Sequence, residues 1–145
     1  WHWFDGDAAA AEVRRLLVPG GRVAVCGFDW LPLPGTVSGV TEALIQTHNP
    51  SWTLGGIRDP GPWARRQLGG AGLVELETFT FDVDVPYAVN SWRRRIGASA
   101  AILDLSAEAA AAFDVELAEV LADRFPGDDL IAPHRVWASV AVSPA

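Results

Sequence analysis

The sequence predicts an α/β fold in which helices alternate with strands that share one sheet. The first observation is an amphipathic segment that breaks at Pro19-Gly20-Gly21 and leads directly into an apolar strand. The second is a run of alternating apolar and polar residues over Leu73–Val85, and the third is an apolar strand over His134–Val142. The complete order is helix, strand, helices, strand, helices, strand.

The first predicted helix covers Ala8–Leu17, with Asp7 as its N-cap. It ends at Pro19, because proline cannot continue a helix and the following glycines adopt the backbone angles that reverse the chain. Arg22–Phe28 shows hardly any alternation, which is typical of a strand covered by helices on both faces. We therefore expect Cys26 to be a buried, structural residue rather than a reactive thiol.

The middle of the chain predicts helices over Thr36–Thr47 and Trp63–Leu68, separated by a loop rich in glycine and proline. Leu73–Val85 follows as a strand whose regularly exposed acidic side favours a sheet edge or a strand that projects beyond its helix cover. Its apolar positions change from even to odd numbers at Thr78. One extra residue in the strand would restore the register, so the pattern predicts a β-bulge near Thr78.

The last third predicts a helix from Pro86 to about Leu103, then a second helix over Ala107–Phe125 that Ser106 caps. His134–Val142 closes the chain as a strand. Both of its faces are apolar, which favours an interior position in the sheet.

Composition excludes several classes of function. Eleven basic residues stand against eighteen acidic ones, a net charge of −7, which argues against nucleic-acid binding. The one dense basic run, Arg93-Arg94-Arg95, is most simply a solvated helix surface. No apolar run is long enough to span a membrane, so we expect a soluble cytoplasmic protein. The chain starts at Trp1 and contains no methionine, which indicates a piece of a longer protein.

Two clusters of residues carry a resemblance to a known family. The first is Leu16-Leu17-Val18-Pro19-Gly20-Gly21 before an apolar strand, together with Trp1-His2-Trp3-Phe4-Asp5. The second comprises Val85-Pro86-Tyr87, Trp92-Arg93-Arg94-Arg95-Ile96, Phe125-Pro126-Gly127 and His134-Arg135-Val136-Trp137. Together they resemble the second half of a class I S-adenosylmethionine-dependent methyltransferase, in particular a bacterial subgroup that acts on small molecules. That subgroup often has a glycine where this chain has Arg94.

The resemblance implies a fold for nearly all of the chain. Residues 1–145 would be the C-terminal portion of a single methyltransferase domain, whose glycine-rich cofactor loop lies in a missing first half. Arg22–Phe28 would be the fifth strand of a Rossmann-like sheet covered by helices. Strands 5, 7 and 6 would lie in that order, with strand 7 antiparallel, and inserted helices would occupy about residues 86–125.

The function implied by the resemblance is methyl transfer from S-adenosylmethionine, the cofactor, to a small molecule. The isolated fragment is then expected to be inactive, because Gly69-Gly70-Ala71-Gly72 precedes a strand and cannot be the cofactor loop. The alternative is a non-catalytic half-domain that self-associates or binds a protein partner, since loss of the first strands would expose an edge of the sheet.

Five residues are candidates for the site. By resemblance, His2 and Trp3 lie close to the cofactor, Asp29 and Trp30 face the methyl acceptor, and Trp92 belongs to a helix that covers the pocket. His2 and Asp29 are also weak candidates for a general base, and the catalytic residues are otherwise unknown. Four of them have a simpler structural interpretation: solvent exposure for His2, packing for Trp3 and Trp92, and helix capping for Asp29. The three histidines are widely separated, so no metal site is expected.

Overall fold

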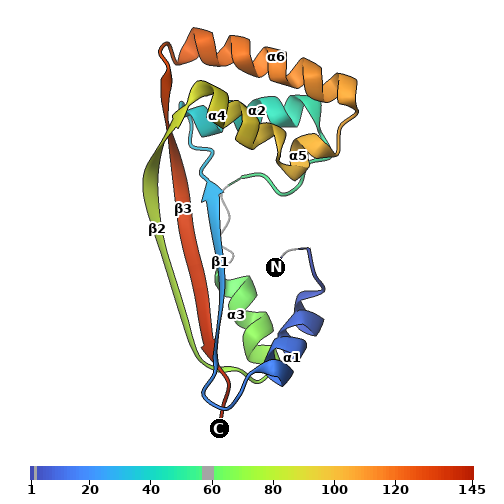
Figure 1. The fold of residues 1–145 in the computed structure, drawn as a ribbon, viewed down its shortest axis with the longest axis vertical. Coiled ribbons are helices and arrows are strands. Elements are labelled where there is room, and N and C mark those ends of the chain that lie inside the picture. Colours follow the sequence, from blue (N-terminus) through green and yellow to red (C-terminus); the bar gives the residue numbers. More distant parts are fainter. Residues whose placement is uncertain (2, 57–60) are drawn as a thin grey trace. The chain divides into compact units, whose positions relative to one another are not determined.

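The computed structural model describes residues 1, 3–56 and 61–145. It is an α/β structure, as the sequence predicts (Figure 1). Its elements are α1 (Gly6–Leu16), β1 (Arg22–Trp30), α2 (Val37–His48), α3 (Gly61–Gly70), β2 (Val74–Ala88), α4 (Val89–Gly97), α5 (Ala100–Leu103), α6 (Ala107–Arg124) and β3 (Asp129–Val142).

The three strands form one sheet in the order β1-β3-β2. The central strand β3 is antiparallel to both neighbours. Beside β1, the amide of Ser143 donates to the carbonyl of Gly21, and Trp137 lies against Gly27. Beside β2, Ser139 contacts Thr78 and Arg135 binds Asp82. The first and second strands are therefore parallel, which confirms the order and directions expected for strands 5, 7 and 6.

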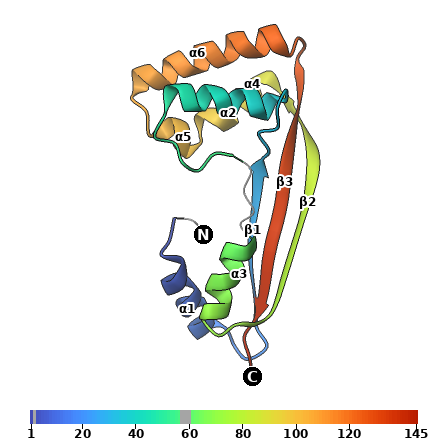
Figure 2. The ribbon, with the colours of Figure 1, turned by 180° about the vertical axis from the view of Figure 1, so that it is seen from behind.

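The chain divides into two compact units. The described residues of the first unit lie within Trp1–Asp29, Arg58–Asp82 and Arg135–Ala145. In this unit α1 and α3 lie side by side (Figure 2) and pack on the sheet. Their shared core consists of Ala10, Val25, Ala64, Leu68, Leu73, Trp137 and Ala141.

The second unit contains residues within Trp30–Ile57 and Val83–His134. Here α6 packs against α2 and α4 (Figure 1). Trp92 and Phe113 are the largest fully buried side chains, and both belong to this core. Helices α2, α4, α5 and α6 therefore share one hydrophobic core with the first residues of β3.

The N-terminus of α1 differs by two residues from the prediction. Asp5 is the N-cap, and its side chain accepts hydrogen bonds from the amides of Asp7 and Ala8 at 3.1 and 3.0 Å. Asp7 lies in the first helical turn, where a carboxylate favours the positive end of the helix dipole. The helix ends before Pro19 as predicted, and Gly20 adopts the left-handed conformation with φ 74°.

The expectation that β1 is buried on both faces is wrong for the described part of the chain. Val25 points into the core beneath α1 and α3, whereas Cys26 is exposed and the side chain of Phe28 is 43% exposed. Both helices of this unit pack on the same face of the sheet. The sequence pattern correctly marks apolar residues on both faces, but no described helix of this unit covers the second one.

The predicted bulge near Thr78 is also wrong. Leu76 packs in the core with Ala141, and Thr78 lies opposite Ser139, so the strand keeps its alternation between these positions. Phe79 and Phe81 therefore lie on the other face, where they are 52% and 53% exposed. The apolar positions change from even to odd numbers because β2 is apolar on one face at Leu76 and on the opposite face at Phe79 and Phe81. The irregular residue of this strand is Glu75, with φ 51°.

Other element boundaries differ from the prediction as well. β2 continues through Pro86 to Ala88, so α4 begins at Val89, and the single helix expected up to about Leu103 is divided into α4 and α5. Proline is tolerated there because β2 is an edge strand, whose outer amides need no partner strand. β3 begins at Asp129, five residues earlier than expected, and the amide of Val89 donates to the carbonyl of Asp128 beside it.

An ion pair joins β2 and β3 in the first unit. Arg135 donates from Nε and Nη2 to the two carboxylate oxygens of Asp82, at 2.7 and 2.8 Å. These hydrogen bonds, with the opposite charge of Arg135, hold the pKa of the Asp82 carboxyl below its ordinary value. A lowered pKa favours the folded state at neutral pH, and this contribution is lost as the pH falls through the folded-state pKa.

The contact between Gly27 and Trp137 yields a test of the packing. A Cβ atom on Gly27 would collide with the indole of Trp137. We expect Gly27→Ala to lower the free energy of unfolding by about 1–3 kcal/mol, measured as the urea midpoint and slope. Gly70→Ala is the control, because a Cβ there meets no atom within 4 Å. Equal stability of the two variants would contradict this packing.

Candidate functional site

The carboxyl ends of β1 and β2 lie in the second unit, as does the beginning of β3 between them. In open α/β sheets, ligands bind beyond the carboxyl ends of the parallel strands. The side chains at this end of the sheet are therefore the candidates for a functional site.

Four aromatic rings from the three strands and α4 meet there, and we call them the aromatic cluster: Trp30, Tyr87, Trp92 and His134. Trp92 is at their centre, with its ring 6.2 Å from Trp30 and 5.2 Å from Tyr87, both in edge-to-face geometry. It is 0% exposed, and its indole N–H donates to the hydroxyl of Thr41 at 3.0 Å. This position is fixed by packing and by a hydrogen bond at once.

His134, on the central strand β3, is fully buried. Its Nδ1 lies 2.9 Å from the carbonyl oxygen of Ala132, so Nδ1 carries the hydrogen and donates it. Nε2 lies a long 3.4 Å from the hydroxyl oxygen of Tyr87, while the two rings stack 5.7 Å apart. The arrangement holds His134 in one tautomer beside a phenol.

Glu42 supplies a nearly buried carboxylate to the same unit, with 7% of the residue exposed. Its two oxygens accept hydrogen bonds from the indole N–H groups of Trp30 at 3.1 Å and Trp52 at 3.2 Å. The guanidinium of Arg95 lies over the ring of Trp30, 5.7 Å from its centre. Trp30 is thus held by a carboxylate at its edge and by a cation on its face.

The sequence-predicted residues are distributed between the two units. Trp30 and Trp92 come together in the aromatic cluster. Asp29 lies in the first unit, where its carboxylate accepts from the indole N–H of Trp137 at 2.9 Å. Trp3 belongs to the first unit and is 70% exposed. His2 lies outside the described residues.

Sequence reasoning missed Glu42, Tyr87 and His134 as members of this site. Glu42 gives no signal in the sequence, because its two indole partners are 12 and 10 residues away and meet it only after folding. The hydroxyl of Tyr87 and the imidazole of His134 approach each other across 47 residues. Both lie within the second cluster of motifs, which is the one sequence feature that could have placed them together.

Within the described residues, no group of three or more His, Cys, Asp and Glu side chains could hold a metal ion. None of the described helices is long and apolar enough to cross a membrane.

The solved structures that resemble this chain include two methyltransferase structures. One is phosphoethanolamine N-methyltransferase 2 of Haemonchus contortus, crystallised with phosphomonomethylethanolamine and S-adenosylhomocysteine. It is 17% identical with a TM-score of 0.41, over 99% of this chain and 31% of that chain. The other, of Bacillus halodurans C-125, is provisionally described as a methyltransferase. It is 14% identical with a TM-score of 0.48, over 96% of this chain and 63% of that chain.

This chain spans less than two thirds of the length of either protein. No protein-family model matches it, and no curated protein does. The strand order and directions, rather than these two likenesses, carry the fold assignment.

The carboxylate of Glu42 can be tested directly. Glu42→Gln turns one accepting oxygen into an N–H donor that faces an indole donor. We expect it to lower the free energy of unfolding by about 1–3 kcal/mol and to shift the tryptophan emission, both followed during urea titration. Glu119→Gln, on the exposed face of α6, makes the same chemical change and should leave both quantities unaltered. An equally stable Glu42→Gln would contradict the two hydrogen bonds.

Proposed function

We propose that this chain is the acceptor-side half of a cytoplasmic S-adenosylmethionine-dependent methyltransferase that acts on a small molecule. The observation that carries the proposal is the strand order β1-β3-β2 with the central strand antiparallel. That arrangement is the one that the resemblance implies for strands 5, 7 and 6. The aromatic cluster at the carboxyl ends of β1 and β2 supports it, because this is where such a sheet binds its ligands.

Methyl transfer from a sulfonium is a displacement at an already activated carbon, so the protein mainly has to position the two reactants. In this proposal Trp30, which is partly exposed, contacts the acceptor. Trp92, fully buried, contacts the ring of Trp30 edge-on and is therefore a positioning residue. Asp29 and His2 remain the candidates for a base where the acceptor needs one. His2 and Trp3 are proposed as cofactor contacts.

The described residues do not make a complete site for S-adenosylmethionine. No glycine-rich loop among them follows a strand and opens a helix, which is the arrangement a nucleotide cofactor needs. Trp3 is the one proposed cofactor contact among the described residues, and it is exposed. The proposal therefore assigns the main cofactor contacts to a preceding part of a longer protein.

Calorimetry with S-adenosylmethionine tests the proposal on two proteins. The 145-residue chain should bind weakly or not at all, whereas the longer gene product should bind it and transfer methyl groups. In that product, Trp30→Ala should lower kcat/KM about tenfold, as expected for about 1.4 kcal/mol of lost contact. Leu103→Ala, at a side chain that is 69% exposed, is the matched control.

Two results would each refute a different part of this proposal. Micromolar binding by the 145-residue chain would refute the division of the cofactor site. An absence of both heat and thermal shift in the longer product would refute methyl transfer.

A second candidate function is self-association through the sheet. Cys26, Phe79 and Phe81 are exposed on the face of the sheet opposite α1 and α3, which we call the open sheet face. Cys26 and Phe81 lie on the strands that flank β3 on either side. An apolar face beside the outer edge of β1, which pairs with no strand among the described residues, favours contact with another copy of the chain.

Sedimentation velocity at two concentrations tests this second candidate. The chain should form dimers as its concentration rises, and the double variant Phe79→Ser/Phe81→Ser should raise the dissociation constant at least about tenfold, through loss of buried apolar area. Val115→Ser removes an apolar side chain that is 59% exposed on α6 and serves as the control. A strictly monomeric chain at both concentrations would exclude self-association.

A further inference from the structure

Asp29 presents an exposed carboxylate next to the last residue of β1, in the first unit. Its Oδ2 accepts a hydrogen bond from the indole N–H of Trp137 at 2.9 Å. Within the described part of the chain, its Oδ1 accepts no further hydrogen bond and the carboxylate belongs to no ion pair. One oxygen is therefore fixed by an indole, and the other is open to a ligand.

The pairing of β1 with β3 fixes the indole in turn. The amide of Ser143 donates to the carbonyl of Gly21, and in that register Gly27 lies opposite Trp137. A Cβ at Gly27 would collide with the indole, which is 7% exposed and packs in the core of the first unit. The ring of Trp137 thus has one position, and it holds the carboxylate of Asp29 in one orientation.

A row of charged side chains crosses the sheet at the same level. Two residues further along each strand, the same register sets Asp29 opposite Arg135. On the other side of β3, Arg135 donates through two nitrogens to both carboxylate oxygens of Asp82. The three side chains carry a net charge of −1. Because the fork of Arg135 binds Asp82, the excess negative charge lies at Asp29.

The hydrogen bond to Trp137 does not by itself require a charged acceptor. The buried indole of Trp92 donates to the hydroxyl of Thr41, and the indole of Trp1 donates to the amide oxygen of Gln67. Neutral oxygens therefore satisfy indole donors elsewhere in this chain. The negative charge at position 29 needs another explanation.

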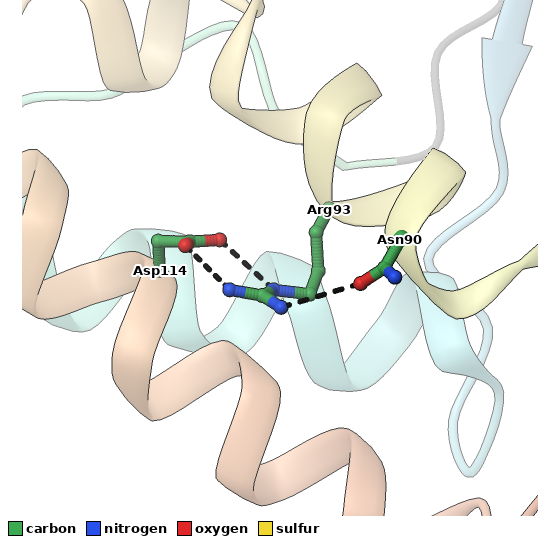
Figure 3. Close-up of polar contacts among 3 residues, drawn as sticks. All are labelled: Asn90, Arg93 and Asp114. Atoms are coloured by element: carbon green, nitrogen blue, oxygen red, sulfur yellow. Dashed lines mark hydrogen bonds and ion pairs between the residues drawn. The ribbon is translucent and has the colours of Figure 1, made fainter.

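Two carboxylates of the second unit show the contrast, because both oxygens of each are bound. Figure 3 shows the guanidinium of Arg93, which donates to both oxygens of Asp114. Glu42 accepts from two indoles, one at each oxygen. Asp29 has only one oxygen bound in this way, which leaves the second for a molecule that comes from outside.

We propose that Asp29 binds a protonated amine of the methyl acceptor, and that Trp137 is the positioning residue that orients its carboxylate. The inference names the acceptor class and rests on the proposed methyl transfer. An ammonium group supplies both a positive charge and an N–H donor for the second oxygen. A protonated nitrogen has no lone pair to receive a methyl group, so the bound amine anchors the acceptor and a different atom is methylated.

Titration of the 145-residue chain tests the ligand class without the cofactor. The probes are butylammonium, butanol and butyrate at constant ionic strength, and the readout is the indole N–H signal of Trp137 in NMR spectra. We expect butylammonium to shift this signal saturably and to bind about fivefold more tightly than either other probe, or better. An absence of saturable shifts with butylammonium, or equal binding of butanol, would overturn the proposal.

Loss of the charge tests the location. Asp29→Asn keeps an oxygen for the indole and should weaken butylammonium binding about fivefold, with the weak binding of butanol unchanged. Asp123→Asn, at an exposed position of α6, removes the same charge and should change neither. Wild-type affinity of Asp29→Asn for butylammonium would place the amine elsewhere and refute the assignment.

Loss of the indole N–H tests the positioning role. Trp137→Phe keeps a ring over Gly27 and should weaken butylammonium binding about threefold, followed at the backbone amide of Asp29, but should have no effect in the Asp29→Asn background. Gly27→Ala, which displaces the same indole, should act in the same way. Trp63→Phe, a change beside the same core, is the control. Equal effects of Trp137→Phe with and without the carboxylate would show that its role is only structural.

Failure of this inference and failure of the proposed function give different results. A chain that binds no butylammonium, beside a longer gene product that transfers methyl groups, would refute the amine class alone. Butylammonium binding by the chain, with no S-adenosylmethionine bound by the longer product, would refute methyl transfer and support Asp29 as an amine site.

Discussion

The central position of β3 is the constraint on which the rest of the structure depends. β3 lies between β1 and β2 and pairs with each of them in antiparallel fashion. Because β3 runs against both neighbours, β1 and β2 end at the same edge of the sheet. Trp30 and Tyr87 are brought to that edge from segments 57 residues apart only because the last strand of the chain separates and aligns them. His134, on β3 itself, completes the contact.

The tryptophan side chains stabilise this fold through hydrogen bonds from the indole N–H as well as through packing of the ring. A buried indole donor that lacks an acceptor would oppose folding, and the structure supplies an acceptor from a different element in each case described. These pairs are Trp1 with Gln67, Trp30 and Trp52 with Glu42, Trp92 with Thr41, and Trp137 with Asp29. Five of the seven tryptophans thus fix specific neighbours, which accounts for a high content of a residue that is costly to place.

Local signals in the sequence were sufficient for the sheet and insufficient for the site. The break at Pro19 and the two-faced apolar pattern of the last strand depend on adjacent residues, and both predictions were confirmed. The bulge near Thr78 was wrong because the pattern was interpreted as one buried face, whereas Phe79 and Phe81 are apolar and exposed. Glu42 and His134 could not be predicted, since an acceptor for two indoles and a fixed tautomer are products of tertiary packing.

Because Cys26 is exposed, the open sheet face carries a thiol that can be labelled chemically. It is the chain's sole thiol, so one fluorophore or spin label attached through sulfur would occupy one defined place. That place lies on the apolar surface itself, on β1. A molecule that covers this surface therefore shields the label from water, and the emission wavelength of an attached fluorophore reports the binding.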